Sequence, residues 1–176
     1  MQHPEDEQIV TLLRDASTLE KGFRMMMAKY QEKVYWHIRR IVEDHDDTDD
    51  ALQNTFIKAY RGFANFEGRS GLYTWLYRIA TNEALSLMKS KKSKGTMTLE
   101  DYHQGNAEHD FDEEKALKKL ARALEDLPEK QRLVFNLRYY DEMSYQEMSE
   151  VLDTSVGALK ASYHHAVKKI EAYLLA

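Results

Sequence analysis

The sequence predicts an all-α fold of two small helical domains joined by a flexible acidic linker, the C-terminal domain being a helix-turn-helix. Only 2 prolines and 7 glycines occur among the 176 residues, so the chain has few helix breakers. Apolar residues recur three and four positions apart over long stretches, which is typical of amphipathic helices. A strongly acidic segment without this periodicity separates the two periodic halves.

Charge is distributed unevenly along the chain, whose net charge is -5. Residues 1–20 carry five acids and one base, residues 21–94 nine acids and 14 bases, residues 95–114 seven acids and no base, and residues 115–176 nine acids and ten bases. Basic surfaces bind phosphate backbones by releasing counterions, although solvated helix faces also carry such charges. The net negative charge disfavours indiscriminate coating of DNA, so nucleic-acid binding is expected only at local patches.

Composition excludes several classes of protein. The chain has no cysteine, which excludes a disulfide scaffold, a cysteine-ligated zinc site and a thiol nucleophile. No apolar run approaches the ~18 residues that a membrane span needs. The acidic start at residues 1–7 does not resemble a secretory signal peptide, so a cytoplasmic location is expected.

The sequence also argues against an enzyme. Its histidine groups are His164-His165 and His37 with His45. Adjacent histidines on a helix point about 100° apart, unlike the i, i+4 pair of a zinc protease. Because there is no glycine-rich phosphate loop either, we predict no catalytic site, no metal, no cofactor and no small-molecule substrate.

Residues 1–94 are predicted to form the first domain, with residues 1–20 as an N-terminal arm. From Phe23 onward the apolar residues recur with helical spacing until an acidic break. Within that break, Asp46 or Asp47 is expected to cap the next helix by accepting backbone N–H bonds.

The next helix is expected to run to about Arg61 with two contrasting faces. Its apolar face carries Leu52, Thr55, Phe56 and Ala59, and its other face carries Asp50, Gln53, Asn54, Ile57, Lys58 and Arg61. A loop with three glycines and two phenylalanines, residues 62–71, precedes a third helix. The third helix buries Leu72, Trp75, Leu76, Ile79, Ala80, Leu87 and Met88 and ends in a lysine-rich run, where cations suit a helix C-terminus.

Residues 95–113 show no apolar periodicity and are predicted to be the linker. The second domain then covers residues 114–176. Its first helix carries an apolar face of Leu117, Leu120, Ala121, Leu124 and Leu127. Pro128 ends that helix and suits the first turn of the next one.

The strongest local pattern lies near the C-terminus. Ser144 and Glu147 have the spacing of a capping box at the start of a short helix. Asp153-Thr154 forms a turn, and Ser155 is expected to cap a longer helix whose outward positions are Gly157, Lys160, Ala161, His164 and Lys168. This is the helix-turn-helix pattern, in which the second helix enters the DNA major groove. From spacing alone, an ordinary helical hairpin with a solvated face fits equally well.

Longer stretches of the chain resemble a known family. Segments of the second half resemble domain 4 of bacterial sigma factors: Leu127–Phe135, Ser144–Leu152 and Ser155–Lys160. Segments of the first half resemble domain 2: Asp47–Arg61, Phe66–Ser70 and Thr74–Asn82. Domains 1 and 3 of the larger sigma factors have no counterpart. The chain therefore resembles the small, two-domain extracytoplasmic-function (ECF) members of the sigma-70 family.

The resemblance implies a protein that binds core RNA polymerase, directs it to specific promoters and helps to melt the -10 region. In the family, the helix matching Asp50–Arg61 docks on a coiled coil of the largest polymerase subunit. This implies core binding by Asp50, Gln53 and Asn54. Asn54 departs from the family pattern, which commonly has an acid there.

The loop Asn65–Gly71 and the following helix match the element that reads and opens the -10 region. A melted strand needs aromatic faces for stacking, a pocket for an extruded base and cations along its backbone. The residues expected to supply these are Lys58, Arg61, Phe66, Tyr73, Tyr77, Arg78 and Asn82. Trp75 keeps the apolar register and is expected mainly in the core.

The domain 4 resemblance places Lys160, Ala161, His164 and His165 where the family reads the -35 element, and Lys168 extends this basic face. Ser162 and His165 stand where family members often carry arginine. Fewer cations lower the sequence-independent part of DNA binding and its salt dependence. We therefore predict a weaker, partly protonation-dependent contact with the -35 element.

The resemblance also implies further contacts. The linker of such factors threads the polymerase channel that RNA later occupies, where the acids of residues 100–114 mimic a phosphate backbone; a solvated tether explains these acids equally well. Family members are usually held inactive by an anti-sigma factor, often membrane-anchored. An anti-sigma partner that holds the chain at the membrane is therefore expected.

The main alternative is a stand-alone helix-turn-helix regulator that uses its first domain for dimerisation or signal sensing. The face with Asp50 and Gln53 and the aromatic loop argue against it, because a duplex-only binder does not need stacking aromatics beside a glycine-rich loop. The two predicted functions differ in whether the protein binds promoter DNA tightly without polymerase, as a stand-alone regulator would.

Overall fold

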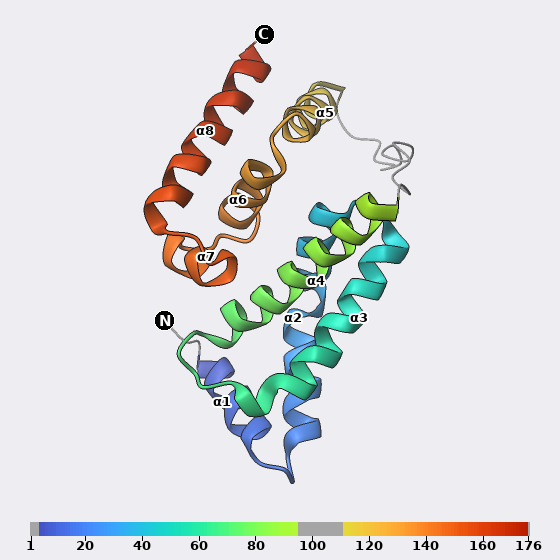
Figure 1. The fold of residues 1–176 in the computed structure, drawn as a ribbon, viewed down its shortest axis with the longest axis vertical. Helices are drawn as coiled ribbons and strands as arrows, with labels where there is room; N and C mark the ends of the chain where they lie inside the picture. Colours follow the sequence, from blue (N-terminus) through green and yellow to red (C-terminus); the bar gives the residue numbers. More distant parts are fainter. Residues whose placement is uncertain (1–3, 95–110, 176) are drawn as a thin grey trace. The chain divides into compact units, whose positions relative to one another are not determined.

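The computed structural model describes residues 4–94 and 111–175, and all regular structure within these ranges is helical (Figure 1). The all-α prediction is confirmed over this part of the chain. The contacts divide it into two compact units, one built mainly from α1 to α4 and one mainly from α5 to α8, and each is described by itself. Most of the predicted linker, residues 95–110, lies outside the described residues. None of the described helices combines the length and the apolarity of a membrane span.

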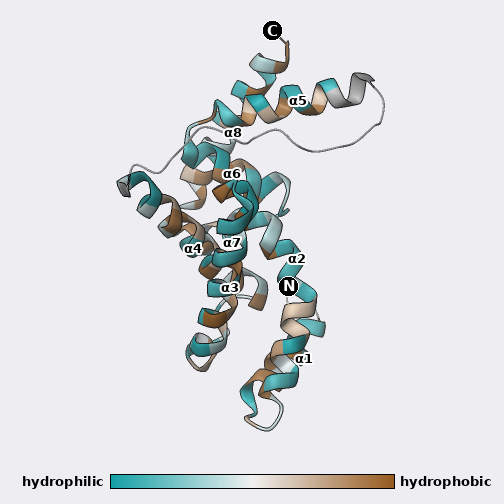
Figure 2. Ribbon diagram, turned by 90° about the vertical axis from the view of Figure 1, so that its right-hand side faces the viewer, coloured by the Kyte–Doolittle hydropathy of each residue, from teal (hydrophilic) through white to brown (hydrophobic). Residues whose placement is uncertain are grey.

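The first unit is a bundle in which α2, α3 and α4 pack against one another in pairs while α1 packs on α2 (Figure 1). Its elements are α1 (Pro4–Arg14), α2 (Leu19–Val42), α3 (His45–Gly62), the short 3-10 helix η1 (Phe63–Asn65) and α4 (Leu72–Lys94). Each of these helices carries both apolar and polar positions along its length (Figure 2), as expected for amphipathic helices. The apolar stripes meet in a core that includes Val34, Ile38, Phe56, Ala59, Leu76 and Ala80.

The predicted N-terminal arm contains a packed helix, α1. The buried carboxylate of Asp6 accepts hydrogen bonds from the Tyr30 hydroxyl at 2.5 Å and from the Lys29 ammonium at 2.8 Å. Near the turn that joins the two helices, the end of α1 lies so close to α2 that a Cβ added to Gly22 would be 2.9 Å from the backbone nitrogen of Leu13. A glycine is therefore needed at position 22, where the start of α2 packs against the end of α1.

The packing of α1 on α2 shifts the pKa of two side chains, Tyr30 and Lys29. Burial and the hydrogen bond to Asp6 raise the pKa of the Tyr30 hydroxyl. Burial by itself lowers the pKa of Lys29, but its hydrogen bonds and charge interactions with Asp6 and Glu5 outweigh that effect and raise it. Both shifts favour the protonated side chains that hold α1 against α2.

Asp44 caps α3, so the prediction that Asp46 or Asp47 is the cap was wrong. The Asp44 carboxylate accepts the backbone N–H of Asp47 at 2.9 Å, and Asp44 has the extended backbone of an N-cap residue. Asp46 and Asp47 lie in the first turn, where acids favourably oppose the positive end of the helix dipole. Asp47 also forms an ion pair with Lys91 and so ties α3 to α4.

The second unit places α5 and α6 against the long C-terminal helix. Its helices are α5 (Phe111–Glu125), α6 (Glu129–Tyr139), α7 (Tyr145–Leu152) and α8 (Val156–Leu175). Helix α5 begins at Phe111, inside the predicted linker, and Pro128 directly precedes α6 as expected. The buried cluster between these helices comprises Ala123, Leu127, Phe135, Ala166 and Ile170.

Helices α7 and α8 form the predicted helix-turn-helix. The capping box is present: the Glu147 N–H donates to Ser144 Oγ at 3.2 Å, and the Ser144 N–H donates to Glu147 Oε2 at 2.8 Å. Asp153 makes the turn in the left-handed region, with φ 50°. Ser155 then accepts the Ala158 N–H at 3.3 Å and caps α8.

Candidate nucleic-acid interface

The outer face of α8 has the polarity that the helical spacing predicts. Leu159, Ala166 and Ile170 are buried against the rest of the second unit. The predicted -35 residues are all exposed: Lys160, Ala161, His164, His165 and Lys168. The rings of His164 and His165 lie edge to face with centroids 5.9 Å apart. This face is therefore exposed along about two turns of one helix.

The predicted -10 residues in the first unit do not form one exposed surface. Tyr77 is only 1% exposed and packs against His37, with ring centroids 4.7 Å apart. Phe66 is 7% exposed and packs against Phe63 and Trp75. The expectation that Phe66 and Tyr77 offer free faces to a melted strand does not fit this burial, because both rings already pack inside the first unit.

Tyr73 is partly exposed but lies on the side of α4 that faces α2. Its ring packs on Tyr30 and Tyr77, with centroids 5.9 and 4.3 Å away. Arg78 and Asn82, four residues apart, share the opposite, exposed face of α4. The structure thus separates Tyr73 from the other two predicted residues.

The two predicted cations on α3 differ in their surroundings. Lys58 forms an ion pair with Glu83 of α4. Arg61 is exposed at the C-terminal end of α3, and no ion pair joins it to an acid among the described residues. Of these two side chains, Arg61 is the one that is available to a phosphate without first breaking an ion pair.

The loop before α4 lies beside Arg14, a cation on α1. Gly68 has φ +73°, which favours glycine, and a Cβ added there would lie 3.5 Å from Nη2 of Arg14. The loop's own Arg69 pairs with Glu67 at 2.5 Å. Sequence reasoning missed Arg14 because residues 1–20 were treated as an arm rather than as a helix that returns to this loop.

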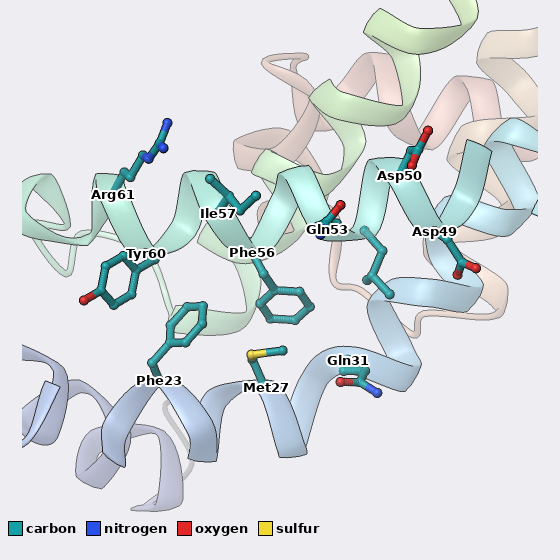
Figure 3. A pocket seen from close by; sticks show the side chains of 11 residues that line it. Phe23, Met27, Gln31, Asp49, Asp50, Gln53, Phe56, Ile57, Tyr60 and Arg61 are labelled. Carbon is teal, nitrogen blue, oxygen red and sulfur yellow. The ribbon is translucent and has the colours of Figure 1, made fainter. Parts of the chain in front are cut away.

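A groove between α2 and α3 borders the predicted polymerase-binding residues (Figure 3). Asp50, Gln53 and Asn54 are all exposed on α3, and Asp50 and Gln53 line the groove, whereas Asn54 does not. The groove has a volume of about 750 Å³. Its lining comprises Phe23, Met27, Gln31, Asp49, Asp50, Leu52, Gln53, Phe56, Ile57, Tyr60 and Arg61.

The groove combines an apolar floor with charged ends. Phe23 contacts the rings of Phe56 and Tyr60, at centroid distances of 6.2 and 5.1 Å (Figure 3). Ile57 and Tyr60 remain 41% and 48% exposed, and both line the groove, so the exposed apolar surface here is contiguous rather than scattered. Sequence reasoning missed this apolar part, although the outward register of Ile57 among polar residues was a signal for it.

Two family models match the chain in order along its length. The model of sigma-70 region 2 matches residues 26–94, and the model of sigma-70 region 4 matches residues 117–170. The RNA polymerase sigma-H factor of Pseudomonas aeruginosa is 30% identical, over 97% of this chain and 94% of that protein. The ECF RNA polymerase sigma-E factor of Escherichia coli strain K12 is 32% identical, over 86% of each chain.

The chain belongs to the sigma-70 family. It is an ECF sigma factor, and the resemblance inferred from the sequence is confirmed. The region 2 match contains the exposed face of α4 and the whole groove lining except Phe23, and the region 4 match contains the outer face of α8. Helix α1 lies before the first matched residue.

The fold of this sigma factor is also seen in solved structures. The structure of CnrH in complex with the cytosolic domain of CnrY matches with a TM-score of 0.73, at 23% identity over 97% of both chains. The sigma factor RpoE of Bartonella quintana, in complex with the anti-sigma factor NepR, matches with a TM-score of 0.74, at 22% identity over 89% of this chain and 98% of that one.

Proposed function

We propose that this sigma factor uses three surfaces on two domains, one to bind polymerase and two to recognise the promoter. Residues 1–94 form domain 2, residues 114–176 form domain 4, and residues 95–113 join them. The groove between α2 and α3 binds core RNA polymerase, the face around α4 holds the -10 element, and α8 reads the -35 element. The observation that carries the proposal is the ordered match of regions 2 and 4 in one chain.

The groove supplies what a polymerase helix needs for docking. An apolar floor of Phe23, Met27 and Phe56 can bury the apolar side chains of a partner helix, and buried apolar anchors supply most of the free energy of such interfaces. Asp50 and Gln53 at the edge provide a charge and an amide to fix its register. Asn54 extends this contact along α3.

The -10 surface is proposed to consist of exposed polar residues backed by buried rings. Arg78 and Asn82 on α4 bind the melted strand, and Arg61 and Arg14 provide cations beside it. Phe66 and Tyr77 act by supporting the loop and α4 from inside. A stacking role for Tyr73 or Phe66 requires the strand to displace ring contacts present in the free protein.

The -35 surface is proposed to consist of Lys160, Ala161, His164, His165 and Lys168. Ala161 allows the helix backbone to approach the bases closely, while the lysines bind phosphates. The proposal gives the chain no reaction of its own, since polymerase performs the chemistry of transcription. We expect the chain to act in the bacterial cytoplasm, where polymerase and DNA meet.

An anti-sigma factor is a proposed regulatory partner. Two proteins of similar fold have been solved with such a protein or with a cytosolic domain bound. The exposed apolar groove of the first unit supports the proposal, because a partner that fills it excludes polymerase. If the partner is membrane-anchored, it holds this sigma factor at the membrane until release.

Run-off transcription tests the proposed function. The purified protein is mixed with bacterial core polymerase and a fragmented genomic library. We expect specific transcripts that vanish without the protein, and their upstream sequences define its promoter. Absence of both transcripts and core binding would contradict the proposal and favour a stand-alone helix-turn-helix regulator.

A further inference from the structure

Helix α1 belongs to the first unit but lies outside the residues that the family model matches. The model of sigma-70 region 2 begins at residue 26, whereas α1 covers Pro4–Arg14. Asp6, Ile9 and Leu13, three and four residues apart, form one buried stripe of this helix. Helix α1 is therefore a packed part of the first unit, and its two ends contact different parts of the proposed -10 surface.

One end of α1 is connected to Tyr73 of α4 through Tyr30 of α2. The buried Asp6 carboxylate accepts the Tyr30 hydroxyl at 2.5 Å, and Tyr30 is buried as well. The Tyr30 ring packs on Tyr73 at a centroid distance of 5.9 Å, and Tyr73 packs on Tyr77 at 4.3 Å. Because the hydrogen bond to Asp6 fixes the Tyr30 ring, it also limits where the Tyr73 ring can lie.

A lysine of α2 strengthens this contact. The Lys29 ammonium donates to Asp6 at 2.8 Å and pairs with Glu5 at 2.9 Å, and its Nζ lies 5.4 Å from the centroid of the Tyr30 ring. The buried carboxylate thus has two donors from α2, as a buried charge requires. A shift of α1 along α2 would leave buried polar groups without partners, so this end of α1 is firmly held.

The other end of α1 lies beside the loop before α4 (Figure 1). Gly68 in this loop has φ +73°, and a Cβ built there would be 3.5 Å from Arg14 Nη2, an ordinary van der Waals distance. The Arg14 side chain therefore borders the turn at Gly68 and limits how far the loop can move toward α1. Asp6 and Arg14 are about 12 Å apart along the helix, so one rigid element contacts both the loop and the aromatic side of α4.

We propose that α1 positions the -10 surface, with Asp6 holding Tyr73 through Tyr30 and Arg14 holding the loop at Gly68. Reading an extruded base requires a pocket whose walls stay in place. Part of the base selectivity at the -10 element is thus assigned to two positioning residues that precede the matched region. The inference rests on the proposed -10 role of the surface around α4. Arg14 then acts both as a cation beside the strand and as a support for the loop.

The test measures binding of holoenzyme, reconstituted from the full-length protein and core polymerase, to labelled single-stranded DNA. The strand carries the -10 region of a promoter recovered by run-off transcription, and a second strand has one -10 base changed. The ratio of the two affinities is the base selectivity of each variant. A variant that merely destabilises the first unit lowers the active fraction equally on both strands and leaves this ratio unchanged. A displaced loop or tyrosine ring lowers the ratio.

Variants of the Asp6 contact test the first positioning residue. Asp6→Ala removes the acceptor of the Tyr30 hydroxyl and is expected to reduce base selectivity about three- to tenfold, with unchanged affinity for core polymerase. Asp6→Asn keeps an acceptor oxygen and should lose less. Tyr30→Phe removes the other partner of the same bond, so combining it with Asp6→Ala should cause no further loss. Glu7→Gln, an acid-to-amide change at an exposed position of α1, is the matched control and should keep the natural selectivity.

Variants of Arg14 separate its support of the loop from its charge. Arg14→Lys keeps the cation but not the planar guanidinium that borders Gly68. It is therefore expected to keep the salt dependence of strand binding while it loses base selectivity about threefold, as much as Arg14→Ala does. Arg24→Lys, the same change at an exposed position of α2, is the matched control and should leave selectivity unchanged.

Three outcomes overturn the inference. These are unchanged selectivity in Asp6→Ala or in Arg14→Lys, a loss of core polymerase affinity as large as the loss on the -10 strand, or a loss of selectivity in Glu7→Gln equal to that in Asp6→Ala. If Arg78→Ala and Asn82→Ala also bind the strand normally, the proposed -10 role of α4 fails too. That result is distinct, because the inference alone fails when the α4 variants weaken strand binding and the α1 variants keep their selectivity.

Discussion

The outer face of α8 and the surface around α4 are proposed to bind the same promoter, but they are built differently. Along α8 the predicted residues are all exposed on the outer side of the helix, while Leu159, Ala166 and Ile170 are buried on the inner side. Around α4 the exposed predicted residues, Arg78 and Asn82 among them, are backed by the rings of Phe66 and Tyr77, which the free protein buries. A duplex can be read by a fixed helix face, whereas a melted strand needs a surface shaped by several elements.

The first prediction tests whether the buried rings of the first unit are structural. Tyr77→Leu is expected to cost about 2–3 kcal/mol of folding free energy, because it leaves a gap against His37 and Tyr73. Denaturant unfolding followed by tryptophan fluorescence measures this, since Trp36 and Trp75 both lie in the first unit. Arg78→Leu, on the exposed face of α4, is the control with little expected change. Normal stability of Tyr77→Leu with impaired strand binding would restore Tyr77 as a stacking residue.

The second prediction concerns the groove, which is proposed to bind polymerase, whereas α8 is proposed to bind only DNA. Ile57→Asp places a charge over the apolar floor and is expected to weaken core polymerase binding about 30-fold or more, the usual loss at an interface hot spot. Titration of labelled core polymerase measures the affinity. Arg78→Ala should bind core polymerase normally, and equal affinity of both variants would remove the groove from the proposed interface.

The third prediction separates free cations from paired ones on the -10 surface. Arg78→Ala is expected to slow open-complex formation about tenfold, because it removes a cation from the exposed face of α4. Lys58→Ala is expected to change the rate only about twofold, because Lys58 is already paired with Glu83. Permanganate footprinting of the melted region measures both rates. A larger loss for Lys58→Ala would mean that its ion pair breaks when DNA binds.

The fourth prediction concerns the histidines of α8. Both are exposed on the face proposed to meet the -35 element, and any positive charge they gain on acidification favours phosphate binding. Binding of holoenzyme to a -35 duplex is therefore expected to strengthen about two- to threefold from pH 8 to pH 6. His164→Gln with His165→Gln should remove this dependence, and an undiminished pH effect in that variant would assign it to other groups.

The helix-turn-helix was predictable from sequence because its signals are local. Ser144 and Glu147 fix one helix start, and the spacing from Leu159 to Ile170 fixes the buried side of α8. The start of α3 was less predictable, because several aspartates lie close together and only the backbone conformation of Asp44 selects the cap.

The -10 surface was less predictable because aromatic residues serve both cores and stacking sites. Composition and motif position do not distinguish the buried rings of Phe66 and Tyr77 from exposed ones. The groove depends on contacts between Phe23 of α2 and Tyr60 of α3, which are far apart in sequence. Arg14 reaches Gly68 only because α1 folds back on α2.

The most direct test of the two-surface account compares transcription from duplex and premelted promoters. Premelting the -10 region removes the free energy of strand opening, so it should largely restore Arg78→Ala and Asn82→Ala. It should not restore Lys160→Ala, whose lost contact is with duplex DNA upstream. The account predicts this selective rescue, whereas equal rescue of both sets of variants, or rescue of Lys160→Ala alone, would contradict it.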